Sequence, residues 1–226
     1  MARIARAVAA GHPHHITQRG NREERIFFRP ADYRTYLAFM AEACAKEGVR
    51  IWAWCLMPNH VHLVVVPRTA GGLARAVGEA HRRYTRLINL RKGWQGHLLQ
   101  GRFASCVLEA SRVLAAVRFI ERNPVRAGRV KRPWQWPWSS ARARVAGLGD
   151  ALVAAGGPLA AKVPDWRRFL AAPEDAKELA AIRHHLRTGR PLGGPAFVAR
   201  LERRLGRVLH CRKRGRPPGR KNKRKM

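Results

Sequence analysis

Apolar residues recur with two different periods over the first 145 residues of the chain, which predicts strands alternating with helices. Segments rich in β-branched and aromatic residues predict strands over 14–19, 49–56, 62–66 and 102–109. Helical spacing predicts helices over 32–48, 73–90 and 111–123, with Asp32 and Ser111 capping the first and the last of them. The Asn123-Pro124 step ends the last helix, because the residue before a proline avoids the α region.

The predicted elements follow one another in the order βαββαβα. Two helices packed on one face of a small antiparallel sheet form the ferredoxin-like or RRM-like plan, so we predict an α+β domain over residues 1–145. Alanine and glycine become more frequent from residue 146, which predicts a helical extension over 146–211 with short helices over 174–187 and 195–205. The last fifteen residues, 212–226, hold nine Lys or Arg and no acid, and we expect them to be disordered without a partner.

The charge of the chain indicates what kind of partner it binds. Its 226 residues include 46 Lys and Arg against 14 Asp and Glu, a formal net charge of +32, and such self-repulsion favours a polyanionic partner, nucleic acid above all. No apolar run reaches the roughly 18 residues that a membrane span needs, so we expect no membrane partner. The N-terminus lacks the apolar stretch of a secretory signal and the four cysteines form no CxxC pair, so we expect a cytoplasmic, nucleoid-associated protein.

Two histidines stand two residues apart at the start of the strand predicted over 62–66. Strand geometry sends alternate side chains to the same face, so His60 and His62 point the same way. Two neutral imidazoles are good ligands for a divalent ion and leave positions open for oxygen ligands or a phosphate. The alternative is a pair of histidines that only form hydrogen bonds within a sheet.

The surroundings of this pair resemble a known family. The resemblance runs, in the family's order, through the stretches HITQRGN (15–21), WCLMPNHVH (54–62), GHLLQGRF (96–103), FIERNPVRAG (119–128), WSS (138–140) and GRPL (189–192). Together these stretches are similar to the REP-associated tyrosine transposases, a branch of the HUH single-strand transposase superfamily. The resemblance implies an HUH fold, a catalytic tyrosine on a helix facing the sheet, and a divalent metal, magnesium or manganese, over His60 and His62, with Asn123 completing the metal site.

The chain departs from the family at the nucleophile, which precedes the NPVRAG stretch by four residues and is here Phe119. A phenyl ring cannot attack phosphorus. The only tyrosines are Tyr33, Tyr36 and Tyr84, and Tyr84 is the best substitute because its helix should also pack on the sheet. Its place within an apolar stripe favours core packing instead. A metal-activated water that hydrolyses DNA directly is a third alternative.

Basic and polar residues near the predicted ends of the strands are candidate DNA contacts, although solvated charge is the alternative for each one. The candidates in the family-like stretches are Arg19, Asn21, Arg22, Gln100, Arg102 and Arg126. In the tail, Arg214 and Arg216 belong to an Arg-Gly-Arg-Pro sequence similar to an AT-hook, which inserts arginines into a narrow minor groove. A nonspecific tail that releases counterions is the alternative there.

Three functions follow from these observations. The first is a transposase-type enzyme that binds structured single-stranded DNA, as hairpins or palindromic repeats, and cleaves and rejoins it by metal-assisted transesterification. The second is a catalytically retired, sequence-specific DNA-binding protein, which Phe119 favours. The third is an RNA-binding module, because the fold and the charge suit RNA as well. The number of subunits stays open, a homodimer included.

Overall fold

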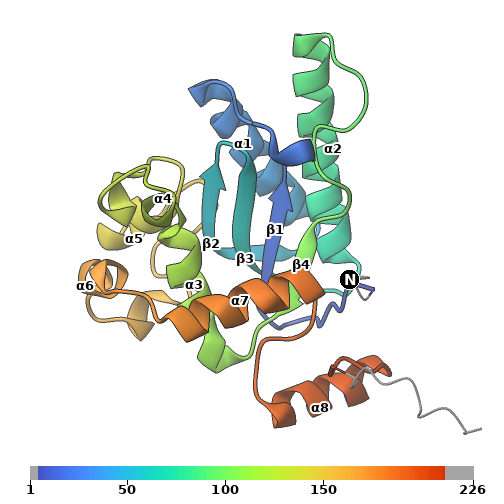
Figure 1. Cartoon of the computed structure of the whole chain (residues 1–226), viewed down its shortest axis with the longest axis vertical. Coiled ribbons are helices and arrows are strands. Elements are labelled where there is room, and N and C mark those ends of the chain that lie inside the picture. Colours follow the sequence, from blue (N-terminus) through green and yellow to red (C-terminus); the bar gives the residue numbers. More distant parts are fainter. Residues whose placement is uncertain (1–4, 212–226) are drawn as a thin grey trace, which may run out of the picture.

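The fold is built on one four-stranded antiparallel sheet (Figure 1). A computed structural model describes residues 5–211, so the predicted tail, with Arg214 and Arg216, lies outside the described residues. The strands are β1 (His14–Arg19), β2 (Val49–Met57), β3 (His60–Pro67) and β4 (Ala104–Val107), and their order across the sheet is β2-β3-β1-β4. This is the strand order of the ferredoxin-like plan, and the predicted α+β class is confirmed.

The register of the sheet decides which residues share a face. In β3, Val61, Leu63 and Val65 join one apolar core. His60, His62 and Val64 alternate with them and face the other side of the sheet. Thr17 of β1 lies opposite His62, and Arg19 lies opposite His60. The central strand β1 therefore brings its own side chains next to the histidines.

Two long helices cover the first face of the sheet. These are α1 (Pro30–Lys46) and α2 (Gly72–Lys92), which pack against each other and, with Ile16, Leu63 and Val65, enclose the larger core. The prediction that Asp32 caps the first helix from outside is wrong, because Arg29 is the N-cap and Asp32 lies within the first turn. From there its carboxylate accepts hydrogen bonds from the backbone N–H groups of Phe28 and Arg29, which still satisfies the free end of the helix.

The histidine face of the sheet is covered by shorter helices. They are α3 (Val113–Glu121), α4 (Asn123–Arg126), α5 (Ala141–Val145), α6 (Trp166–Ala171) and α7 (Ala176–Thr188). The helix predicted over 111–123 differs at both ends: residues 110–112 form a 3-10 turn, and α3 ends at Glu121. Pro124 then lies in the first turn of α4, where a missing N–H costs nothing.

The extension packs on this same side of the molecule. Leu159, Ile182 and Leu186 share a core with Val64 and Phe119. The last helix, α8 (Pro195–Leu205), packs against the N-terminal segment through Ala7 and Ala9. The helices predicted over 174–187 and 195–205 are thus present, and no helix of residues 5–211 has the length and apolarity to cross a membrane.

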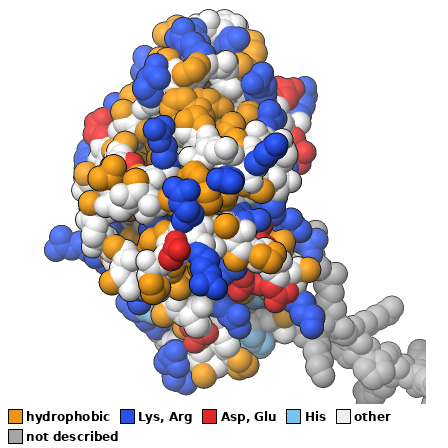
Figure 2. All heavy atoms as spheres, turned by 90° about the vertical axis from the view of Figure 1, so that its left-hand side faces the viewer, with side chains coloured by type: hydrophobic (Ala, Val, Ile, Leu, Met, Phe, Trp, Pro, Cys, Tyr) orange, Lys and Arg blue, Asp and Glu red, His pale blue; other side chains and the backbone are white. Residues whose placement is uncertain are grey.

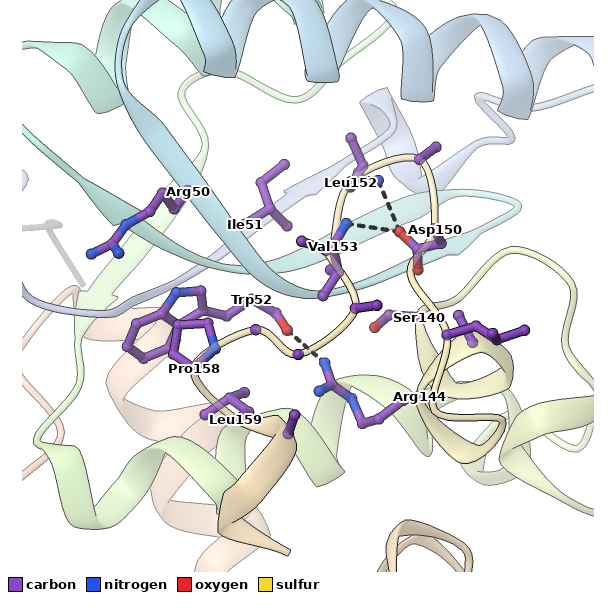
Figure 3. Close-up of a pocket in the computed structure, with 18 of the residues that line it drawn as sticks. Arg50, Ile51, Trp52, Ser140, Arg144, Asp150, Leu152, Val153, Pro158 and Leu159 are labelled. Carbon is purple, nitrogen blue, oxygen red and sulfur yellow. Dashed lines mark hydrogen bonds between the residues drawn. The ribbon is translucent and has the colours of Figure 1, made fainter.

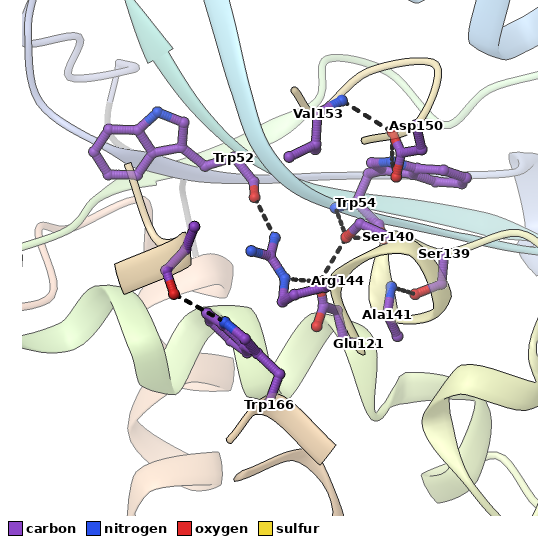
Figure 4. A network of polar contacts seen from close by, with 11 residues as sticks. Trp52, Trp54, Glu121, Ser139, Ser140, Ala141, Arg144, Asp150, Val153 and Trp166 are labelled. Atoms are coloured by element: carbon purple, nitrogen blue, oxygen red, sulfur yellow. Dashed lines mark hydrogen bonds and ion pairs between the residues drawn. The ribbon is translucent and has the colours of Figure 1, made fainter. Parts of the chain in front are cut away.

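A buried polar network fastens α3 to the outer edge of β2 (Figure 4). Glu121 Oε1 accepts hydrogen bonds from Ser140 Oγ (2.6 Å) and from Arg144 Nε (2.8 Å). Ser140 also donates its backbone N–H to the carbonyl oxygen of Trp54 at 3.0 Å, and Arg144 donates to the carbonyl oxygen of Trp52. This network caps the free edge of the sheet and fixes the orientation of α3 toward the histidines.

Candidate functional site

His60 and His62 lie side by side on the face of the sheet that α3 covers. Their ring centroids are 5.1 Å apart and the rings are nearly perpendicular, at 87°. Asn123, the first residue of α4, approaches from the opposite side, with its Nδ2 atom 3.0 Å from Nε2 of His60. The structure therefore brings together the three residues expected to hold a metal.

Hydrogen bonds to neighbouring residues orient both imidazoles. The Nδ1–H group of His60 donates to Asn59 Oδ1 at 2.7 Å, so its Nε2 carries a free electron pair and accepts from Asn123. Nδ1 of His62 lies 3.0 Å from Nε2 of His15, a buried residue of β1. His60 is thus held through Nδ1 with Nε2 facing Asn123, the usual arrangement of a metal-binding histidine, and the contact with His15 holds the ring of His62.

The three imidazoles are neutral at physiological pH. Burial, with the charges of Arg19 and Arg126 adding to it, lowers the pKa of His60 to about 4. Burial lowers the pKa of His15 to about 3, and burial and the neighbouring imidazoles hold the pKa of His62 well below its ordinary value. Their electron pairs are therefore available to a cation.

These donors fit a divalent ion. Within residues 5–211 no group of three or more His, Cys, Asp or Glu side chains is arranged to hold a metal, so the candidate ligands are the two imidazoles and the side chain of Asn123. Nδ1 of His15 is buried and lacks a hydrogen-bond partner among the described residues. A set of two or three protein ligands leaves several positions for oxygen atoms of water or of a bound phosphate.

Phe119 occupies the position at which the resemblance places the nucleophile. Its ring is 6% exposed and lies edge-on to the histidines, with centroids 5.7 Å from His62 and 5.6 Å from His15. The guanidinium of Arg126 lies over the same ring, 4.2 Å from its centroid. The position adjoins the His pair as the family pattern requires, and the side chain that fills it carries no hydroxyl.

No tyrosine replaces it. The chain has three tyrosines, and all of them belong to the core on the opposite face of the sheet. Tyr84 is fully buried there, and its hydroxyl donates to the carbonyl oxygen of Ile26 at 2.7 Å. Tyr84 packs in the core, as its apolar stripe favours, and the alternative in which it substitutes for the nucleophile fails for a physical reason: α2 packs on the side of β3 that carries Leu63, whereas the histidines point the other way.

The histidines open onto a basic recess of about 500 Å³. Four of the predicted DNA contacts line it, namely Arg19, Gln100, Arg102 and Arg126. Asn21 and Arg22 do not; they lie exposed in the 3-10 turn after β1. Arg19 forms an exposed ion pair with Glu23 (2.6 Å), and Arg126 pairs with Glu174 (2.6 Å).

Two further arginines of the recess, Arg183 and Arg187, were not singled out from the sequence. They belong to α7, and their four-residue spacing on a predicted helix was the available signal. Lys and Arg side chains are also scattered over the face that carries α4, α5 and α6, among hydrophobic side chains and a smaller share of Asp and Glu (Figure 2). The site therefore attracts anions.

A second cavity, of about 400 Å³, lies between α1, the edge of β2 and the segment 150–160 (Figure 3). Its walls include Ile51, Trp52, Leu152 and Leu159, and no histidine lines it. Asp150 shapes the loop over it by accepting hydrogen bonds from the backbone N–H groups of Leu152 (2.8 Å) and Val153 (2.9 Å). This apolar cavity is separate from the histidine site.

An arginine-lined recess beside a pair of neutral imidazoles favours a polyanionic partner. The sequence model of the family described as "Transposase IS200 like" matches residues 8–123, which is more than half of the chain. The chain belongs to the IS200-like transposase family, and the resemblance inferred from its motifs is confirmed.

One solved structure agrees on the fold. A REP-associated tyrosine transposase bound to a REP hairpin is 22% identical, with a TM-score of 0.57 over 68% of this chain and 92% of that one. A putative transposase from Deinococcus radiodurans R1 is 15% identical, with a TM-score of 0.38 over 54% of this chain and 97% of that one. No curated protein matches the chain.

Proposed function

We propose that this chain is a DNA-binding member of its family that holds structured single-stranded repeat DNA at the His60–His62 pair without forming a tyrosine–DNA bond. The observation that carries the proposal is the placement of Phe119 against His62 and His15, together with the burial of all three tyrosines behind the sheet. A transesterification of the family type needs a hydroxyl at this position. The DNA-binding function therefore has more support than cleavage and rejoining.

His60, His62 and Asn123 would hold the divalent ion. When bound, such an ion neutralises charge on a phosphate oxygen. Magnesium prefers oxygen ligands and keeps several waters, whereas imidazole is a better ligand for transition ions, so the donor set favours manganese over magnesium. Asn59 and His15 would keep the two rings in place whether or not the ion is present.

The remaining side chains of the recess bind and orient the strand. Arg126 lies over the ring of Phe119 and Arg19 lies beside His60 across the β1–β3 pair, so a phosphate at the histidines meets a guanidinium on either side. Arg102 and Gln100 line the side formed by the segment before β4. A guanidinium binds phosphate oxygens through two parallel N–H donors, which positions a backbone without reading its bases.

Hairpin DNA is the form we propose as the ligand. The similar REP-associated transposase was solved with a REP hairpin, and this chain has the same fold at 22% identity. The recess of about 500 Å³ lies within the range of pockets that enclose one small molecule, so it can take a single nucleotide of an unpaired strand. A competing structured RNA of the same length should therefore displace the DNA only weakly if repeat DNA is the ligand.

The proposal is tested by incubating the full chain with manganese and a labelled DNA hairpin that carries a single-stranded overhang. We expect the wild-type protein to retard the hairpin on a native gel and to leave it intact and unattached on a denaturing gel. Phe119→Tyr restores the missing hydroxyl and should yield a protein–DNA adduct, while Phe119→Leu should not. An adduct or a cleaved strand with the wild-type protein, or equal binding of structured RNA, would overturn the proposal.

A further inference from the structure

Helix α7 lies on the histidine face of the sheet and outside residues 8–123, which match the family model. It contacts β1, β4 and α3. Its apolar side carries Ile182 and Leu186, which are buried in the same core as Phe119. The adjacent side of the helix is therefore directed at the recess that contains the histidines.

This helix is held at both of its ends. Just before it, the carboxylate of Glu174 pairs with Arg126 at 2.6 Å and with Arg122 at 3.2 Å, both from the stretch that contains Asn123. Just after it, the backbone of Leu192 exchanges hydrogen bonds with Val107 (2.8 Å) and Glu109 (2.9 Å), at the end of β4. A helix fixed in this way presents its side chains in a defined position relative to the histidines.

Arg183 and Arg187 stand one turn apart on α7 and both line the recess. Their side chains are exposed, and within residues 5–211 neither of them forms an ion pair. Burial lowers the pKa of Arg126, the ion pair with Glu174 raises it, and the charge of Arg183 is a smaller effect that lowers it. Because neither Arg183 nor Arg187 is paired with a carboxylate, their charge in the recess favours a bound anion.

We propose that Arg183 and Arg187 bind a backbone phosphate of the DNA strand beside the phosphodiester at the histidines, so that α7 forms one wall of the nucleic-acid site. The inference rests on the proposed function. Two guanidinium groups a helical turn apart can hold one phosphate from two sides, through charge-assisted hydrogen bonds. α7 lies beyond the family match over residues 8–123, so residues that the family model does not cover would supply this wall.

The test compares three variants of the full chain by fluorescence anisotropy with a labelled DNA hairpin that carries a thymidine overhang. Arg183→Gln/Arg187→Gln removes the two charges of α7. Arg200→Gln/Arg203→Gln is the matched control, because it removes two exposed arginines from α8, away from the recess. His60→Ala/His62→Ala reports on the histidine site itself.

For the α7 variant we expect binding about tenfold weaker than wild type and a log–log salt slope smaller by about 0.7, the value for one lost phosphate contact. The control should change affinity less than threefold, which a general charge effect accounts for. Equal losses in the α7 variant and the control, with wild-type binding still dependent on the histidines, would overturn this inference alone. Absence of hairpin binding by the wild-type chain would overturn the proposed function and this inference with it. Unchanged thermal unfolding of each variant checks that the fold is intact.

Discussion

At the scale of single residues, the tautomer of His60 decides whether its Nε2 can bind a metal. A histidine ligates through the nitrogen that carries no hydrogen, and the hydrogen bond at the other nitrogen selects it. Asn59 makes that selection here, since its Oδ1 accepts from Nδ1 of His60 at 2.7 Å. Nδ2 of Asn59 donates to the carbonyl oxygen of Glu23 at 3.1 Å, which prevents a flip of the Asn59 amide.

Asn59→Ala should therefore weaken manganese binding without touching a ligand. We expect an affinity about 10–100-fold lower, because the ring of His60 then rotates and its protonated nitrogen is no longer fixed. Isothermal titration calorimetry with manganese alone measures this. Asn89→Ala is a suitable control, since that amide only bonds to Gly96 in an exposed loop. An Asn59→Ala protein that binds manganese as tightly as the Asn89→Ala protein would contradict the role of Asn59.

The sequence predicts some residues of the histidine site and not others. The spacing of His60 and His62 predicts two rings on one face, and the family pattern predicts that Phe119 lies near them. The partners that orient the rings could not be predicted in the same way. His15 reaches His62 only because β1 pairs with β3 in one particular register, and register is set by the packing of the whole sheet.

At the scale of elements, the pair of α1 and α2 is held by an ion pair at one end of their shared surface. The carboxylate of Asp32 is 1% exposed and bonds to both terminal nitrogens of Arg91, one of them at 3.0 Å. Burial alone would raise the pKa of Asp32, but the hydrogen bonds from Arg91 and from the backbone of Phe28 and Arg29 lower it to about 2. The ionised carboxylate therefore stabilises the fold.

The pH dependence of this contribution follows from the direction of the pKa shift. An aspartate of the unfolded chain titrates near 3.9, so the stabilisation is complete above about pH 4 and is lost as the pH falls toward 2. We expect Asp32→Asn to lower the unfolding free energy at pH 7 by about 1–2 kcal/mol, because Arg91 is partly exposed and its charge is partly screened. Urea unfolding followed by tryptophan fluorescence between pH 7 and pH 3 measures it.

The control is an exposed ion pair between the same two helices, Glu42 with Arg83 at 2.7 Å. Glu42→Gln should change the unfolding free energy by less than about 0.5 kcal/mol at any pH. If the difference between wild type and Asp32→Asn stayed constant as the pH was lowered to 3, Asp32 would not be the titrating group that we take it for.

The helices and strands themselves could be predicted largely from periodicity, because each one buries an apolar face of its own. The helix predicted over 73–90 is observed as Gly72–Lys92, and the strand predicted over 14–19 is observed with those bounds. What periodicity cannot give is the face of the sheet on which a helix packs. The face on which Tyr84 packs and the position of Arg183 and Arg187 beside the histidines depend on contacts between distant segments, which periodicity does not reveal.

At the scale of the whole molecule, charge governs how strongly and how selectively the chain binds DNA. A net charge of +32 gives affinity for any polyanion, and only part of it can be used at the histidine site. Each phosphate contact with single-stranded DNA adds about 0.7 to the slope of log affinity against log salt, so the slope counts the cations that touch the backbone. The change in this slope when cations are removed therefore separates the contribution of the recess to DNA affinity from that of charge elsewhere on the chain.

Residues 212–226 are the place to test that separation, since nine Lys or Arg stand there without an acid. Removing them should flatten the salt slope by about 0.7 for every tail contact while leaving the effect of His60→Ala/His62→Ala on hairpin binding unchanged. A tail of the same composition with its order permuted should keep the wild-type slope, because counterion release depends on charge and not on order. If the permuted tail lost affinity for an A·T-rich duplex, the Arg214 and Arg216 pair would act as a minor-groove reader. A truncated chain with the wild-type slope would show that the tail makes no contact with DNA and that the whole salt dependence arises from residues 1–211.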